Sequence, residues 1–256
     1  MKTLTILFNL FMYSSITLFA DTNTNGKVFY NYLISLDEER NNAFNMKRAY
    51  LTFANDVSET ISYTVTYDMG SNEGGSSHTA FLKVAMVKWN TSLGNVSIGM
   101  QGLNMFKTME NTWGHRFIQK MPMDTYGFSH SADLGIGITR GFGGIATSAL
   151  VTNGGGYKKA ESDSHKKFSF HAVFGEPKLN NNDGFNAGAS FSVEPYDIDS
   201  VITENTNVMG TFAGYSSSGF RGGLEFDTKQ KNDITSQIIC VYGTYKISER
   251  LSLLAR

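Results

Sequence analysis

The chain has 256 residues, of which 41% are hydrophobic, 26 are glycine and only 3 are proline. Its 22 basic residues nearly balance its 23 acidic residues, so the charge balance gives no support to nucleic-acid binding. A mean hydropathy of −0.22 argues against a helical membrane protein, but it fits a barrel in which only every second strand residue meets lipid. The single cysteine, Cys240, cannot form an intrachain disulfide, and we expect it to fill space in an apolar strand.

The N-terminus has the form of an export signal. Lys2 provides a short basic start, and an apolar run follows over residues 4–18. A membrane anchor is the alternative, but the run is shorter than the roughly 20 residues that a helix needs to cross hydrocarbon. We therefore expect residues 1–20 to be a signal peptide that is cleaved after Ala20, and residues 21–256 to form the barrel domain.

Residues 46–70 predict an antiparallel hairpin, because apolar and polar residues alternate strictly on both sides of a polar turn at residues 55–60. One face carries Ala49, Leu51, Phe53, Ile61, Tyr63, Val65, Tyr67 and Met69. The opposite face carries Arg48, Tyr50, Thr52, Ser62, Thr64, Thr66 and Asp68. An apolar face with a polar reverse suits a strand pair between lipid and a water-filled lumen.

The same alternation recurs along the chain. We expect strands over residues 26–36, 46–54, 61–70, 81–89, 96–101, 132–139, 145–152, 168–174, 185–194, 208–215, 220–226 and 235–245, with a thirteenth from 251. Short turns near residues 56, 92, 142, 181, 217 and 248 alternate with longer polar loops near 74, 115, 160, 200 and 231. This alternation is typical of outer-membrane barrels, which close with an even number of strands. The prediction is an all-β, antiparallel transmembrane β-barrel with a polar lumen, of which about 12 strands and the start of another represent a fragment of a 16- or 18-stranded barrel.

Four basic or acidic residues are candidates for the lumen face. Lys83 and Lys88 stand at an odd and an even position of one strand, so strict alternation turns one of them towards lipid or the headgroups. Lys88 lies beside Trp89 and fits the interface, which leaves Lys83 for the lumen. The lumen candidates are therefore Arg48, Lys83, Arg221 and Glu225.

A long irregular segment, residues 102–130, fits no strand pattern. Its apolar residues, such as Met105, Met109 and Trp113, require something to pack against, so disorder is not expected. It also carries Lys107, Glu110, Arg116, Lys120 and Asp124. Set against one another in a narrow pore, these charges would create a transverse field that selects ions by sign. The alternative is a solvated outer loop with an apolar underside.

A family resemblance rests on five segments: residues 48–53, the Asp-Val-Ser turn at 56–58, and residues 63–68, 132–135 and 246–252. They resemble the outer-membrane porins of Gram-negative bacteria, most of all the phosphate-selective porin O and P group. The resemblance implies an outer-membrane homotrimer in contact with lipid, through which small hydrophilic solutes or ions pass. It also implies that the third outer loop, here residues 102–130, folds into the lumen as the constriction. Inward bases are scattered rather than arranged in a ladder, so phosphate selectivity is not part of the prediction.

Other chemistry finds little support. The five histidines have no spacing that suits a zinc or catalytic pair, so we predict neither a metal nor a cofactor. The Gly-rich residues 153–167 lack the frame of a phosphate-binding loop and are expected to be a flexible outer loop. We predict a diffusion channel that is not an enzyme. The alternative is a non-conducting outer-membrane barrel, either a structural anchor or a hydrolase built around His130 with Ser131, or His171.

Overall fold

The computed structural model describes residues 22–33, 43–70, 78–200 and 202–256, in which it contains 13 strands and two short helices. The expected signal peptide, the charged turn at 37–42 and most of the Gly/Ser loop at 70–79 lie outside the described residues. The strands are β1 Asn23–Leu33, β2 Ala43–Asp56, β3 Ile61–Gly70, β4 Thr79–Thr91, β5 Gly94–Gly102, β6 Ala132–Phe142, β7 Ile145–Thr152, β8 Lys167–Gly175, β9 Gly184–Asp197, β10 Thr203–Ser217, β11 Phe220–Lys231, β12 Ile234–Ser248 and β13 Leu251–Ala255. The helices are α1 Lys107–Trp113 and α2 Pro122–Thr125.

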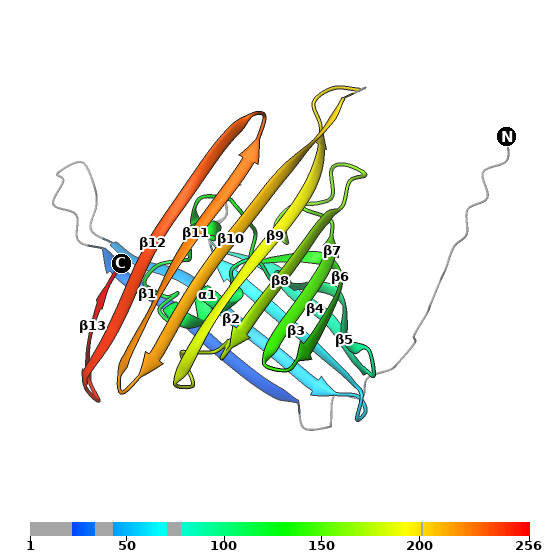
Figure 1. Ribbon diagram of the computed structural model, residues 1–256. Coiled ribbons are helices and arrows are strands. Elements are labelled where there is room, and N and C mark those ends of the chain that lie inside the picture. The colour runs from blue at the N-terminus through cyan, green and yellow to red at the C-terminus, as the bar shows by residue number, and fades with distance from the viewer. Residues whose placement is uncertain (1–21, 34–42, 71–77, 201) are drawn as a thin grey trace, which may run out of the picture.

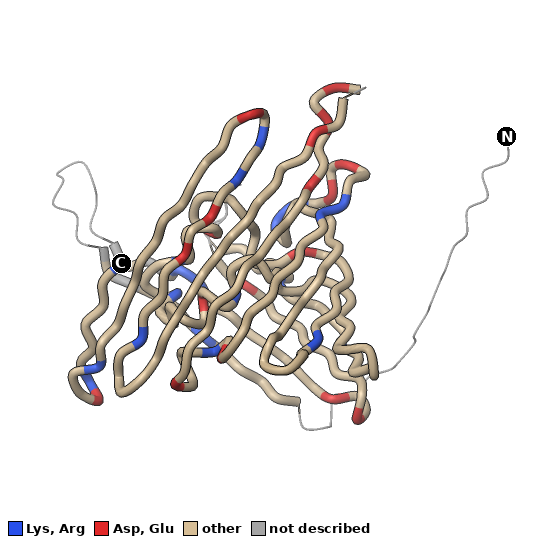
Figure 2. Tube along the Cα trace, viewed as in Figure 1, with Lys and Arg blue, Asp and Glu red and all other residues tan. Residues whose placement is uncertain are grey.

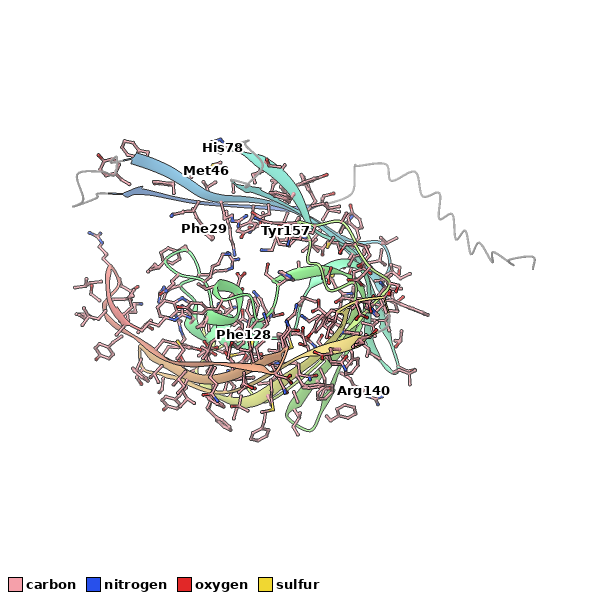
Figure 3. All side chains as sticks on the ribbon, turned by 90° about the horizontal axis from the view of Figure 1, so that it is seen from above. Phe29, Met46, His78, Phe128, Arg140 and Tyr157 are labelled. Atoms are coloured by element: carbon pink, nitrogen blue, oxygen red, sulfur yellow. The ribbon has the colours of Figure 1, made fainter. Side chains whose placement is uncertain are left out.

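The strands form one antiparallel sheet in which each strand pairs with its neighbours in sequence, from β1 to β13 (Figure 1). The sheet curls around the helices, with Phe128 and Tyr157 on its inner side and Arg140 on its outer side (Figure 3). Within the described residues β1 and β13 are its two edges. The predicted all-β antiparallel fold is confirmed, and its completion to 16 or 18 strands stays a prediction.

Side chains are distributed in the reverse of a soluble protein. On β8, Phe168, Phe170 and Phe174 point outward and are 40% to 49% exposed. Between them, Ser169 and His171 point inward and are buried. Inward polar and outward apolar side chains alternate on β9 as well, because successive residues of a strand face opposite sides of the sheet. On β12 the outward residues are again apolar, but the buried inward residues Ile238, Cys240 and Tyr242 are also largely apolar. An apolar outer surface around a polar interior is the distribution that a lipid-embedded barrel requires.

A β-bulge in β4 explains why the orientation of this strand is difficult to predict. The β3–β4 pairing goes from Leu82 directly to Val84, so that Lys83 is the extra residue. The bulge changes the phase of the strand. Lys83 contacts Tyr50 on the inner side, and Lys88 lines an internal cavity. Both lysines thus lie on the inner side, so the expectation that one of them faces lipid is wrong, and a position of Lys88 at the headgroup level stays a prediction.

One turn also differs from its prediction. The connection between β11 and β12 is not a longer polar loop but a tight turn at Asn232 and Asp233, whose φ angles are 51° and 60°. Asn and Asp adopt this left-handed conformation more readily than other residues with a side chain, and two such residues suit a hairpin between twisted strands. The strands on both sides are correspondingly longer than expected.

Many of the charged residues lie in the turns and loops at the two ends of the strands or in the segments that the sheet encloses (Figure 2). None of the helices in the described part of the chain is long and apolar enough to span a membrane. The charged residues in the segments that the sheet encloses are the candidates for a functional site.

Replacing Ile239 with lysine should destabilise the barrel by about 2–4 kcal/mol, the cost of a lysine on the lipid face near the bilayer midplane. Ile239 lies near the middle of β12 and is 78% exposed on the outer face. Ile247→Lys makes the same change on the same strand near its end, where the cost falls to about 0–1 kcal/mol. Urea unfolding in lipid vesicles measures both free energies. Equal losses would contradict a lipid-facing surface.

Candidate functional site

Residues 103–131, which connect β5 and β6, fold into the space that the sheet encloses and are called the constriction loop below (Figures 1 and 3). Its apolar side chains pack against inward residues of β8, β10 and β12. The buried cluster consists of Met105, Phe106, Met109, Trp113, Met121, Met123 and Phe128 of the loop with Val173, Val208, Phe212, Ile238, Cys240 and Tyr242 of the wall. The loop is thus amphipathic, and its apolar face rests on one wall of the barrel.

Polar contacts fix the end of α1 to the same wall. Tyr242 Oη donates to the carbonyl of Met109 at 3.2 Å, and Arg221 Nη2 donates to that of Trp113 at 3.1 Å. Gly114 ends the helix at a φ of 70°, where a Cβ would lie 2.5 Å from Arg221 Nη2. The left-handed backbone favours glycine at this position, and a side chain there would displace the guanidinium of Arg221.

The five charged candidates of the constriction loop form one chain of ion pairs. Lys107 Nζ lies 2.7 Å from Glu110 Oε1, and Arg116 Nε lies 2.7 Å from Glu110 Oε2. Asp124 pairs with both remaining bases: Arg116 Nη2 lies 3.4 Å from its Oδ2, and Lys120 Nζ lies 3.5 Å from its Oδ1. The five charges lie together on the constriction loop and neutralise one another in part. They are not the two opposed patches that a transverse field within the loop would need.

The second group of charges projects from the facing wall, formed by β2, β3 and β4. Asp68 is fully buried, and Arg48 Nη1 lies 3.1 Å from its Oδ1. Lys83 Nζ lies 3.5 Å from Tyr50 Oη and 4.0 Å from Asp68 Oδ2. From the constriction loop, Arg116 Nη1 donates to Tyr50 Oη at 3.0 Å. This hydrogen bond connects the loop to the facing wall across the lumen.

Two cavities meet at Arg116. The first, of 550 Å³, is lined by Tyr50, Lys83 and Glu110 and extends towards Thr52, in the direction of the short β2–β3 turn. The second, of 200 Å³, lies on the side of the long loops. It is lined by Arg48, Arg116, Lys120, Asp124, His130, Ser131, Gly155, Gly156, Tyr157, Lys158 and Lys159. Arg116 lines both cavities, so the Arg116–Tyr50 contact lies at the boundary between them.

The ion pairs determine the protonation of the loop. Burial would raise the pKa of Glu110, but the positive charges of Lys107 and Arg116 outweigh it and hold that pKa below its usual value. Burial would lower the pKa of Arg116, but Tyr50, Glu110 and Asp124 reverse the effect and raise it. The guanidinium at the cavity boundary therefore carries its charge at every physiological pH.

The remaining candidates lie away from this boundary. Arg221 is on the inner face of β11, and its Nη2 also lies 3.3 Å from His115 Nε2. Burial, followed by the charge of Arg221, lowers the pKa of His115, so this imidazole is neutral at pH 7. Glu225 is buried on the same inner face of β11. Arg221 and Glu225 therefore belong to the wall that supports the constriction loop.

Sequence reasoning did not identify Tyr50, Asp68 and Tyr157 as site residues. Tyr50 stood out as the one large aromatic residue on the polar face of its hairpin, and that exception was the available signal. Asp68 shares this face, but its burial and its three partners are tertiary features. Tyr157 lies in a segment whose composition predicts a flexible loop.

An antiparallel barrel with an amphipathic loop inside its lumen is the architecture of a porin. The family model of phosphate-selective porin O and P matches residues 25–236, and the chain belongs to this family. A search of the curated proteins by sequence gave no match. The fold and family together define a porin of the bacterial outer membrane.

Solved structures of outer-membrane proteins share the fold. Outer-membrane expressed OmpT of Vibrio cholerae is 11% identical, with a TM-score of 0.53 over 91% of this chain and 72% of that chain. A loop L8 deletion mutant of OmpT, an outer membrane protein of the same organism, is 10% identical, with a TM-score of 0.51 over 91% and 78%. At these identities the likeness concerns the fold alone.

Acid should loosen the constriction loop only at low pH. Because the pKa of Glu110 is depressed in the folded loop, its ion pairs stabilise the loop above the ordinary carboxyl value of 4.5, and this stability is lost as pH falls through the lower folded value. The fluorescence of Trp113 in a Trp89→Phe background would report the change, since the chain has 2 tryptophans. Adding Glu110→Gln should remove this acid transition. An unchanged transition would show that other groups hold the loop.

Proposed function

We propose that this porin is a passive diffusion channel for small hydrophilic solutes or ions and that its narrowest point lies at the Arg116–Tyr50 contact. The observation that supports this position is that Arg116 lines both cavities, one towards the short turns and one towards the long loops. A solute that moves from one cavity to the other would pass the guanidinium of Arg116. The apolar face of the constriction loop packs against β8, β10 and β12, so the loop would narrow the passage from that side.

The charges around this contact favour anions. Arg48 and Lys83 face Arg116 from the opposite wall, with Asp68 as their acidic partner. On the loop, Lys107 and Lys120 join Arg116, with Glu110 and Asp124 as partners. Five basic residues against three acidic ones leave a positive excess in a partly buried passage, where the effective dielectric is lower than in water. We infer a preference for small anions over cations.

A hydrolase is less well supported. His171 Nε2 lies 3.0 Å from Thr108 Oγ1, so a hydroxyl and an imidazole do meet. Its Nδ1 has no hydrogen-bond partner among the described residues, and a catalytic base would need a carboxylate or carbonyl there to orient it. The imidazole ring stacks on the ring of Phe212, with centroids 5.4 Å apart and an interplanar angle of 7°, which suits a packing role. We therefore propose a channel that is not an enzyme.

The assembly is part of the same proposal. The outward apolar side chains on β6, β8 and β12 would contact outer-membrane lipid or a neighbouring copy of the chain. We propose a homotrimer, with residues 1–20 removed as a signal peptide after export.

Planar bilayer recordings of the full chain test the constriction. The double variant Arg116→Glu, Lys120→Glu should shift the reversal potential in a salt gradient towards cation selectivity. A change of about 1.4 kcal/mol in the energy of an ion at the constriction corresponds to about a tenfold change in the anion-to-cation permeability ratio.

A matched control reverses two charges outside both cavities. Arg140 and Lys178 line neither cavity, and Lys178 is exposed in the connection between β8 and β9. Arg140→Glu, Lys178→Glu should leave the reversal potential close to that of the unmodified protein. An equal shift in both double variants would refute the position of the constriction, and a protein that folds but conducts nothing would refute the channel.

A further inference from the structure

Residues 153–166, which connect β7 and β8, do not extend away from the barrel. The backbone N–H of Asn153 donates to the carbonyl of Leu134 at 3.0 Å, and that of Tyr157 donates to the carbonyl of Ala132 at 3.1 Å. Between them, the N–H of Gly154 donates to Asp133 Oδ2 at 2.5 Å. The first part of the connection is thus attached to the start of β6, and the expectation of a flexible outer loop is wrong there.

The glycines of this segment allow the close packing. Gly156 has a φ of 77°, and a Cβ there would lie 2.7 Å from the ring of His130. Gly154 has a φ of 108°, and a Cβ would lie 2.9 Å from Glu194 Oε1. The backbone angle disfavours a side chain at both positions, and at Gly156 the ring of His130 also occupies the space. The glycine run therefore serves to bring the next residue, Tyr157, into the lumen.

The side chain of Tyr157 is fixed by a buried partner. Its hydroxyl donates to Asp68 Oδ2 at 2.6 Å, while Arg48 holds the same carboxylate. Its ring meets Phe81 edge-on, with centroids 6.3 Å apart. Burial, followed by the hydrogen bond to Asp68, raises the pKa of Tyr157, so its hydroxyl keeps the proton that it donates.

Tyr157 also meets the facing wall of the constriction. Lys83 Nζ lies 4.8 Å from the ring centroid of Tyr50 and 5.5 Å from that of Tyr157, so the ammonium group is close to both rings. Tyr157 lines the cavity on the long-loop side, and Lys83 and Tyr50 line the other cavity. Tyr157 therefore stands at the boundary that Arg116 also occupies, but it reaches this position from a different loop.

We propose that Tyr157 is a second size-limiting residue of the channel, held in the passage by Asp68 and by the glycine-rich start of its loop. This inference rests on the proposed function, because a size limit has meaning only in a conducting barrel. The constriction loop narrows the passage from one wall, and Tyr157 narrows it next to the other. Neutral solutes would be selected by the gap between the Tyr157 ring and Arg116.

Liposome swelling with uncharged sugars of increasing size tests the limit. Tyr157→Ala should admit larger sugars than the unmodified protein and raise the single-channel conductance, whereas Tyr157→Phe, which keeps the ring, should retain more of the original limit. Tyr67→Ala is the matched control, because Tyr67 lies on the outer face of β3 next to Asp68. The control should leave the exclusion limit unchanged. An unchanged limit in Tyr157→Ala would overturn the inference.

A second measurement does not depend on an enlarged pore. In a Cys240→Ser background, the thiol introduced by Tyr157→Cys should react with a water-soluble methanethiosulfonate reagent, and a bulky adduct should reduce the current through open channels. A reaction that leaves the current unchanged would overturn the role of this position. A silent unmodified protein would instead refute the proposed function, so the two failures are distinguishable.

Discussion

Hydrogen bonding between neighbouring strands is the constraint on which this molecule depends. Hydrocarbon offers no water to backbone N–H and C=O groups, so a strand in a membrane must pair on both sides. Every strand from β2 to β12 does so. The pairing fixes the pleat and so sends alternate side chains to lipid and to the lumen. Polar residues at the inward positions of β2 and β3 then lie in the lumen, where Arg48 and Asp68 form an ion pair.

The constriction loop faces a different constraint, which is the burial of its apolar side chains. It enters a polar space with several methionines and a tryptophan, which must be removed from water. Inward residues of the supporting wall, including Val208, Phe212 and Tyr242, provide an apolar surface for them. The charged face of the loop then has only one direction left, towards β2, β3 and β4. The position of Arg116 opposite Tyr50 thus follows from hydrophobic packing on the other side of the loop.

The sequence predicted those features that depend on local alternation. The faces of the first hairpin, the succession of strands and the separate character of residues 102–130 are all visible in the order of residue types. The bulge at Lys83 was not predictable, because it depends on how β3 pairs with β4. The charges of the loop were identified, but their pairing depends on the short helices α1 and α2. Tyr157 was missed because a glycine- and lysine-rich segment has the same composition whether it is flexible or attached.

Because the constriction loop packs against one wall, the remaining space for water lies off the barrel axis, next to the opposite wall. The two sides of the barrel then have different roles. Strands β10, β11 and β12 hold the constriction loop, and β2, β3 and β4 line the remaining passage. Substitutions in the supporting strands alter how firmly the constriction loop is held. Substitutions in β2, β3 and β4 alter which solutes can pass. Substitutions in β2, β3 and β4 can therefore change the size and charge of the passage without disturbing the packing that holds the constriction loop.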